Sequence, residues 1–291
     1  MNKCLVTKLN GSSNNPELLR LGEMRIKILK VSNPTDHTQG FSLGFNKPAT
    51  LEIVSDGYFT DKTLTENKGK RITLNTGTSS IWVNGNSDVE IAILDKYSLT
   101  YINRAYQGEA SSSAYGNNIK LNISDLEYST ALTILVLPNT QVSGDISNLK
   151  SLTALTSIGL SNTQVPLTGD IGQLSTLSNC DYIDLNYSKL TGDLAKVPYK
   201  CRFVSTMSDK GSVFTWSTRP SIAKIIAITG NASLTNIDKM LQDQAQCQVG
   251  FLPDDSSSFK TISVAGNRTS ASDNAVATLQ QKGYTISIAK A

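Results

Sequence analysis

The sequence has few of the residues from which catalytic and metal sites are usually built. Its single histidine, His37, lies in the turn-like stretch NPTDHTQG, and no cysteine lies near it in the sequence. A Ser-His-Asp or Cys-His site is therefore hard to assemble. The four cysteines lie far apart and form no CxxC pair, so a compact zinc site is not expected. We predict no catalytic residue, no bound metal and no cofactor, and we expect the cysteines to be buried free thiols.

Strong net charge and long apolar runs are also missing. The formal net charge is +3 and no dense run of Lys and Arg is present, so we do not expect nucleic acid as a partner. No stretch approaches the ~18 apolar residues of a membrane helix, and we expect no membrane insertion. Lys3 and Lys8 interrupt the first apolar residues, so we expect no secretory signal peptide. A protein that stays in the cytosol, or leaves it by lysis, fits these absences.

Residues 1–110 show the alternation of apolar and polar side chains that is typical of β-strands. Examples are MRIKILKV (24–31), ATLEIVSDGYF, KRITLNTG, SSIWVNGNSDVEIAIL and SLTYI, with Gly, Asn and Asp between them. Short strands separated by frequent turn residues predict a small antiparallel β-sandwich-like domain. VNGN around Gly85 fits a hairpin turn. The small polar residues that follow, 111–118, are predicted to be a linker.

A phrase recurs three times in the second half of the chain. The copies read LTILVLPNTQV, LTSIGLSNTQV and CDYIDLNYSKL, and each leads into a GDI or GDL segment. This spacing of apolar residues is the leucine-rich repeat pattern, L-x-x-L-x-L-x-x-N-x-L, at a fitting period. One such repeat cannot close a core alone, so the repeats are expected to stack into a solenoid. We predict a leucine-rich repeat domain over residues 119–291, with one short strand in each repeat.

The ninth position of each repeat usually carries a buried polar side chain that bonds the backbone of the neighbouring turn. We predict that a ladder of such residues runs along the solenoid. Its members would be Thr140, Thr163, Ser188, Asn231 and Asn267.

The repeat pattern weakens after the third copy and then changes. Residues 201–209 match poorly, and SVFTWSTRP (212–220) is interpreted as an inserted strand or loop. Further on, the stretch LTNIDKMLQDQAQC has apolar residues at helical spacing. A second helix is expected from a cap at Ser270 or Ser272 to a stop at Gly283, followed by the strand YTISI. The whole chain is thus predicted to be α+β but mostly β, with a strand-helix-strand cap at the C-terminal end.

The concave face of the solenoid is the best place to expect binding. The residues between the apolar positions of each strand project from this face, and the third repeat places aromatic, amide and carboxylate groups there. The candidate binding residues are Tyr182, Asp184, Asn186, Tyr187 and Ser157. Such groups together suit a sugar or a peptide. The alternative is that they are ordinary exposed strand residues.

Three aspartates recur with the repeat and should stack in a column along one edge. They are Asp145, Asp170 and Asp193. Such a column has the oxygen ligands that calcium prefers. An aspartate beside a glycine turn also accepts hydrogen bonds from nearby backbone amides, and we favour this structural interpretation.

The opening of the chain and its C-terminal part both resemble known proteins. The opening MNKCLVTKLNGSSNNPELLRLGEMRIKI resembles the N-terminal module of virion proteins of crAss-like and related Bacteroidales phages. The stretches STRPSIAKIIAITGNASLTNIDKMLQDQAQCQVGF and KTISVAGNRTSASDNAVATLQQKGYTISI resemble the end of leucine-rich repeat proteins from the same phages. The resemblance implies a fibre, collar or baseplate-associated virion protein, assembled in the host cytoplasm and docked through its N-terminal domain. Its repeats would contact other virion proteins, or a glycan or protein of the host surface.

The resemblance also implies a homo-oligomer, and it transfers no catalytic residue to this chain. The main alternative is a bacterial cell-surface leucine-rich repeat adhesin, which would need an export signal. A third hypothesis is a hydrolytic enzyme that uses a metal bound by the aspartate column.

Overall fold

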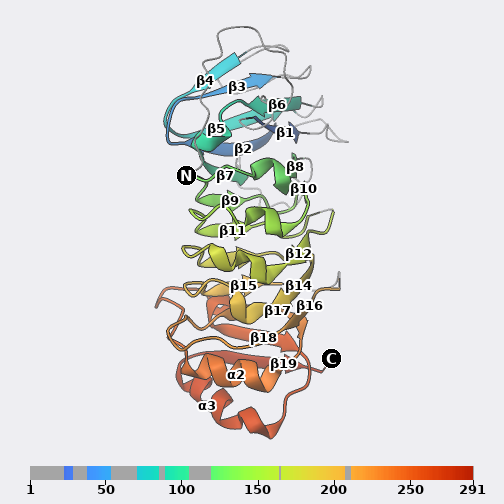
Figure 1. The fold of residues 1–291 in the computed structure, drawn as a ribbon, viewed down its shortest axis with the longest axis vertical. Helices are drawn as coiled ribbons and strands as arrows, with labels where there is room; N and C mark the ends of the chain where they lie inside the picture. The colour runs from blue at the N-terminus through green and yellow to red at the C-terminus, as the bar shows by residue number, and fades with distance from the viewer. Residues whose placement is uncertain are drawn as a thin grey trace, which may run out of the picture.

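The computed structural model describes most of the chain. The described residues are 23–28, 38–53, 71–84, 89–104, 119–163, 165–206 and 211–290. His37, Cys4, the predicted turn around Gly85 and the predicted linker lie outside them. Figure 1 shows an elongated molecule in which coils stack along the long axis, between N-terminal strands at one end and two helices at the other.

The N-terminal strands pair antiparallel, as their alternating sequence predicts. They are β1 (Met24–Ile28), β2 (Thr38–Phe45), β3 (Ala49–Ile53), β4 (Arg71–Leu74), β5 (Gly77–Asn84), β6 (Val89–Ile93) and β7 (Leu99–Arg104). One sheet contains β1, β6, β3 and β4 in that order, and a second contains β7, β2 and β5.

The predicted hairpin between β5 and β6 is not formed by the described residues. Strand β5 pairs with β2, whereas β6 pairs with β1 and β3 in the other sheet. The reason lies in β6, where Ile91, Ala92 and Ile93 are all buried. A strand that is buried on both faces is stable at the centre of a sheet, and β1 and β3 flank β6 in this way.

The sheets of the N-terminal region continue into the repeats. Strand β7 pairs in parallel with β9 (Ile134–Val136), and β8 (Ile119–Asn122) pairs with β1. A single cluster of buried apolar side chains extends from Met24 to Tyr284. The N-terminal strands therefore cover the open end of the solenoid, and the predicted boundary near residue 110 separates two sequence patterns that share one core.

Each coil of the solenoid contributes two strands and, in three cases, a short 3-10 helix. The first strands are β9, β11 (Ser157–Gly159), β13 (Tyr182–Asp184) and β15 (Phe203–Ser205), which form a long parallel sheet. The second strands are β10 (Gln141–Ser143), β12 (Thr168–Asp170), β14 (Lys189–Asp193) and β16 (Val213–Thr215). The 3-10 helices are η4 (Ile146–Leu149), η5 (Ile171–Thr176) and η6 (Leu194–Lys196). The prediction of one strand per repeat was therefore wrong, because segments this short show no recognisable alternation.

The apolar positions of the repeat stack in register through the core. Leu135, Ile158, Ile183 and Val204 are directly paired across β9, β11, β13 and β15, and none of them is exposed to solvent. Each coil thus buries its central side chain against the coils on either side, and burial of a side chain of this size stabilises the fold by about 1.5–3 kcal/mol.

Residues 201–206 and 211–220 belong to a fourth coil, so 212–220 are not the insertion that the sequence predicted. Strand β15 is in register with β13, and β16 is in register with β14. Asp193 is paired with Thr215, so Trp216 lies beside Leu194 of the preceding coil, and it is only 1% exposed. Between the two preceding coils the same offset places Gly192 beside Ile171. Trp216 thus stands where the preceding coil has the glycine of its GDL segment, and this difference conceals the repeat in the sequence.

The C-terminal end has the predicted helices and final strand. Its elements are β17 (Ala227–Leu234), α2 (Ile237–Gln246), η7 (Ser257–Lys260), β18 (Thr261–Ala265), η8 (Ser270–Ser272), α3 (Asp273–Gln281) and β19 (Thr285–Ala289). Strands β17, β18 and β19 extend the long sheet in parallel. Helix α3 ends before Gly283, whose φ of +90° suits glycine. None of the helices in the described part of the chain is long and apolar enough to cross a membrane.

Candidate binding site

The solvent face of the long sheet is built from two rows of side chains. In the first row, Tyr101, Ile134, Ser157, Tyr182 and Phe203 follow one another from strand to strand. Because side chains of a strand point alternately to opposite faces, the residues two positions further on form a second row on the same face. In register order, the second row is Asn103, Val136, Gly159, Asp184, Ser205 and Thr229.

The first row ends in a cluster of three aromatic rings. The Tyr182 and Phe203 rings are stacked, with centroids 5.0 Å apart and planes 7° apart. Phe259, from η7, lies 5.0 Å from Phe203 and 6.1 Å from Tyr182. Ala227 is the partner of Phe203 on β17, and its small side chain lets the Phe259 ring reach across. Tyr182 is half-buried, and this burial, with the nearby Asp184 carboxylate, raises the pKa of its hydroxyl to about 12.

One arginine joins this aromatic cluster to two carboxylates. The Arg202 guanidinium lies 5.2 Å from the centroid of the Phe259 ring, within the range of a cation–π contact. Its nitrogens also lie 2.8 Å from Asp255 and 3.2 Å from Asp181. Sequence reasoning missed Phe203, Phe259 and Arg202. A signal was present for Phe203, which occupies the position of Tyr182 in the next coil, but that coil was judged a poor match.

The predicted residues Asp184 and Asn186 lie beside the aromatic cluster in a hydrogen-bonded group. Thr229 Oγ1 donates to Ser205 Oγ over 2.7 Å, and Ser205 Oγ donates to Asn186 Oδ1 over 2.8 Å. The backbone N–H of Asn186 points at Asp184 Oδ1, 3.4 Å away. Burial raises the pKa of the Asp184 carboxyl above its ordinary value. The structure therefore gathers Tyr182, Asp184 and Asn186 on one face, and Ser157 is next to Tyr182 in register.

Tyr187 lies in the turn after β13 and outside both rows. Its φ is +64°, and the equivalent residues of the two preceding coils, Asn139 and Asn162, both have a φ of +55°. Asparagine tolerates this left-handed conformation better than most residues. It also links neighbouring coils here, because Asn162 Nδ2 donates to Asn139 Oδ1 over 2.5 Å. Tyrosine adopts this conformation only with strain. No ring contact joins Tyr187 to Tyr182 in the described structure.

The predicted ladder residues bond within their own coil and not to the next. Thr140 and Thr163 are buried, and their hydroxyls donate to the carbonyl oxygens of Leu137 and Val165 over 2.7 and 2.8 Å. Both acceptors lie within three residues of the threonine, so these two hydroxyls satisfy the carbonyls of their own turn.

The later ladder positions differ from the prediction. Ser188 is buried, but its hydroxyl has no hydrogen-bond partner among the described residues. Ser212, from the next coil, instead donates to Ser188 O over 2.6 Å and accepts from Leu190 N over 2.9 Å. Asn267 is exposed, because it lies in the loop after β18, so it is not a buried ladder residue. The side chain of Asn231 lies outside the described residues.

The aspartate column caps the 3-10 helices. Asp145, Asp170 and Asp193 each precede one of these helices and accept a hydrogen bond from the backbone N–H two residues further on, over 2.8, 2.7 and 3.0 Å. Asn122 does the same for η3 (Ile123–Leu126). Among the described residues, no group of three or more His, Cys, Asp or Glu side chains is placed to hold a metal ion. Each carboxylate therefore has the capping role that the structural interpretation predicts.

The predicted free thiols are present where the structure describes them. Cys180, Cys201 and Cys247 are buried and form no disulfide. Burial raises the pKa of the Cys201 thiol to about 12, so it is protonated at neutral pH and a poor nucleophile.

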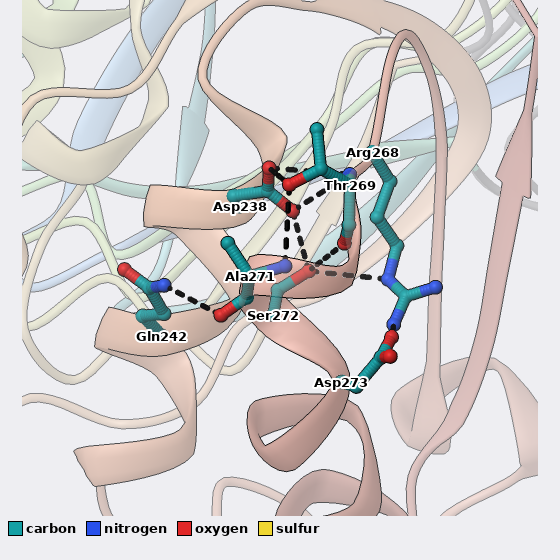
Figure 2. Close-up of polar contacts among 7 residues, drawn as sticks. All are labelled: Asp238, Gln242, Arg268, Thr269, Ala271, Ser272 and Asp273. Atoms are coloured by element: carbon teal, nitrogen blue, oxygen red, sulfur yellow. Dashed lines mark hydrogen bonds and ion pairs between the residues drawn. The ribbon is translucent and has the colours of Figure 1, made fainter.

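A second polar cluster joins the two C-terminal helices (Figure 2). The Asp238 carboxylate of α2 accepts hydrogen bonds from the backbone N–H of Thr269 and from the hydroxyls of Thr269 and Ser272, over 3.1, 2.6 and 2.5 Å. Arg268 Nε donates to Ser272 Oγ over 3.1 Å, and Arg268 also pairs with Asp273. These contacts fasten the start of α3 to α2, and every polar atom in them serves that junction.

Asp238 makes the attachment of α3 sensitive to acid. The hydroxyls of Ser272 and Thr269 hold the pKa of this carboxyl below its ordinary value. The pKa is lower in the folded state, so the stabilisation is complete above the unfolded-state pKa of about 4 and disappears as pH falls through the folded-state value. We expect Asp238→Asn to reduce the hydrogen-exchange protection of the α3 amides by about 1 kcal/mol at pH 7. In strong acid the substitution should have no effect. Hydrogen exchange of these amides as a function of pH measures both, and an equal loss at every pH would contradict the assignment.

Comparison with known proteins found matches among solved structures alone, and they are weak. No family model matches the chain, and no curated protein matches it. The solved structures that it resembles include the leucine-rich repeat ectodomain of the Arabidopsis thaliana receptor kinase GASSHO1/SCHENGEN3, in complex with CASPARIAN STRIP INTEGRITY FACTOR 2. That match has 16% identity and a TM-score of 0.32, over 58% of this chain and 19% of that one. The BIR2 ectodomain of the same plant matches with 20% identity and a TM-score of 0.21, over 27% of this chain and 54% of that one.

Proposed function

We propose that this protein acts by binding, as a structural or adhesive component of a phage virion. The N-terminal strands would form a sandwich-like docking domain in a fibre, collar or baseplate-associated assembly of several copies. The solenoid would present its long sheet to a protein or glycan partner. In this proposal the protein has no catalytic centre, and it is assembled in the host cytoplasm into the virion.

The observation that carries the binding proposal is the aromatic cluster beside a polar row on one face. Tyr182 offers part of a ring to solvent, and Asp184, Asn186 and Ser205 lie next to it with hydrogen-bonding groups. Stacking on an aromatic ring with polar groups at its edge is how sugars and peptide side chains are commonly held. The rings and the hydroxyls are fixed by contacts with one another, so little ordering is needed when a partner binds.

The virion assignment is supported by the resemblance of the two ends of the chain to phage proteins. The shared sheets and core between the N-terminal strands and the first coil support the docking arrangement, because they fix the direction in which the solenoid would project from a docking site.

Immunogold electron microscopy of the producing culture tests the location. With antibody to residues 119–291, we expect gold on phage tails or collars. Gold on cell envelopes would instead favour the bacterial surface adhesin, and gold on neither would remove both assignments.

Removing the Tyr182 ring tests the binding face. We expect Tyr182→Ala to weaken adsorption to host cells at least about tenfold, since central aromatic residues often contribute 2 kcal/mol or more to binding. The substitution should lower the free energy of unfolding by only about 1 kcal/mol, because the ring is half-exposed. The control is Tyr97→Ala. Tyr97 is 45% exposed and lies in η1 (Lys96–Ser98), which is distant from Tyr182 in the sequence. Equal adsorption by both variants would overturn the proposed face.

A further inference from the structure

A groove of about 580 Å³ lies along the connections of the second, third and fourth coils, away from the two rows of the long sheet. Residues 195–200, which follow the start of η6, form one part of it, and Ser178, Thr218 and Pro220 line the rest. Ala195, Val197 and Pro198 are buried and form the floor, whereas Lys196, Tyr199 and Lys200 are exposed and form the rim. The lining is mostly apolar.

Two lysines place positive charge on the rim of this groove. In the part of the chain that the structure describes, neither Lys196 nor Lys200 lies within ion-pair distance of an acidic side chain, and Lys200 Nζ donates to Asn179 Oδ1 over 3.2 Å. A third cation, Arg219, lies beneath the floor and is 2% exposed. Its guanidinium bonds only to backbone carbonyl oxygens among the described residues.

Arg219 also keeps the floor in one shape. Its guanidinium donates to the carbonyl oxygens of Ala195, Val197 and Pro198 over 3.0–3.1 Å. The floor therefore cannot shift without breaking several charge-assisted hydrogen bonds. A groove of fixed shape loses little conformational entropy when it is filled.

Exposed apolar side chains continue the groove outward. Tyr199 is 53% exposed at the rim, and Ile222, in the turn that follows Pro220, is 68% exposed. Large apolar side chains beside an apolar groove favour a partner that brings apolar surface of its own. The density of cations is too low for a nucleic-acid backbone, which needs several phosphate contacts.

We propose that this groove binds an extended segment of a partner protein, in which an apolar side chain is flanked by carboxylates. The apolar side chain would fill the space over Val197 and Pro198, and the carboxylates would lie against Lys196 and Lys200. The proposal does not depend on the aromatic cluster or on the virion assignment, since it concerns a different surface.

Two blocked pentapeptides test this proposal by NMR titration of the full-length, isotope-labelled protein. The first has a central leucine with two aspartates on each side, and the second has asparagines in place of the aspartates. We expect the acidic peptide to shift the amides of residues 195–200 and 218–223 in a saturable way, and the neutral peptide to bind about tenfold more weakly. Equal shifts with both peptides, or no shift in these segments, would overturn the proposal.

Three variants separate the groove from general attraction to a basic surface. K196E/K200E reverses the rim charge and should weaken binding of the acidic peptide about tenfold, which is about 1.4 kcal/mol. Thr218→Trp keeps the cations but fills the groove, and should weaken binding similarly. Lys150→Glu changes an exposed lysine that follows η4 in an earlier coil, and should leave binding unchanged. Binding that responds equally to all three variants would show that the groove is not the site.

Discussion

Replacing Gly192 by alanine is expected to lower the free energy of unfolding by about 2–4 kcal/mol. Gly192 has a φ of +104°, and an added Cβ would lie 1.8 Å from Asp170 Oδ1 of the preceding coil. That oxygen accepts the hydrogen bond from Gly172 N that caps η5, so it cannot move away without losing the cap. The cost therefore combines backbone strain with a lost helix cap. Chemical denaturation measures it directly.

Gly211→Ala is the matched control for this prediction. Gly211 also has a left-handed φ, of +87°, but an added Cβ would meet none of the described residues within 4 Å. Only the backbone term applies there, and we expect a loss of about 1 kcal/mol. If both variants lost the same stability, the packing of glycine against the aspartate column would contribute nothing, and the assigned role of the column would be wrong.

Arg219→Met is expected to cost about 3 kcal/mol of unfolding free energy. Methionine fills similar space, but the carbonyl oxygens of Ala195 and Val197 would lose the donor that satisfies them in a buried site. An unsatisfied buried acceptor costs about 1–3 kcal/mol. Two effects limit the loss. Pro198 O keeps a hydrogen bond from Cys201 N, and removal of a buried charge recovers part of its desolvation cost. The loss of unfolding free energy therefore stays below the summed free energies of the hydrogen bonds that are removed.

Arg202→Met provides the comparison within the same coil. The Arg202 side chain is 19% exposed and pairs with Asp181 and Asp255, whose carboxylates regain contact with solvent when the arginine is removed. We expect a loss of about 1 kcal/mol, in line with ion pairs near a surface. A larger loss for Arg202→Met than for Arg219→Met would mean that ion pairs, and not satisfied carbonyls, hold this part of the solenoid together.

The repeated core was predictable because its signal is local. Leu135, Ile158 and Ile183 recur at one position of a short pattern, and the structure stacks them in register. The two C-terminal helices were predictable for the same reason, since apolar residues at helical spacing lie on one face whatever surrounds them. The buried cysteines followed from their wide spacing.

The sequence-based predictions were wrong or incomplete where the role of a residue depends on a neighbouring coil. Trp216 is buried at the position that Gly192 has in the preceding coil, so SVFTWSTRP was taken for an insertion. The candidate face was predicted from Ser157 of the second repeat and from residues of the third. Its aromatic partners, Phe203 and Phe259, come from the next coil and from a segment beyond α2, and only the folded chain brings them to Tyr182.

The sequence by itself determined the solenoid, its period and the cap at its C-terminal end, because periodic burial needs only the spacing of apolar residues along the chain. Tertiary structure decided which surfaces are available for binding. Side chains such as Phe203 and Ser205 acquire their neighbours through strand pairing between coils. The groove over Arg219 exists only where the connections of three successive coils lie side by side. Contacts of this kind depend on distances across the stack, and no local pattern of residues encodes them.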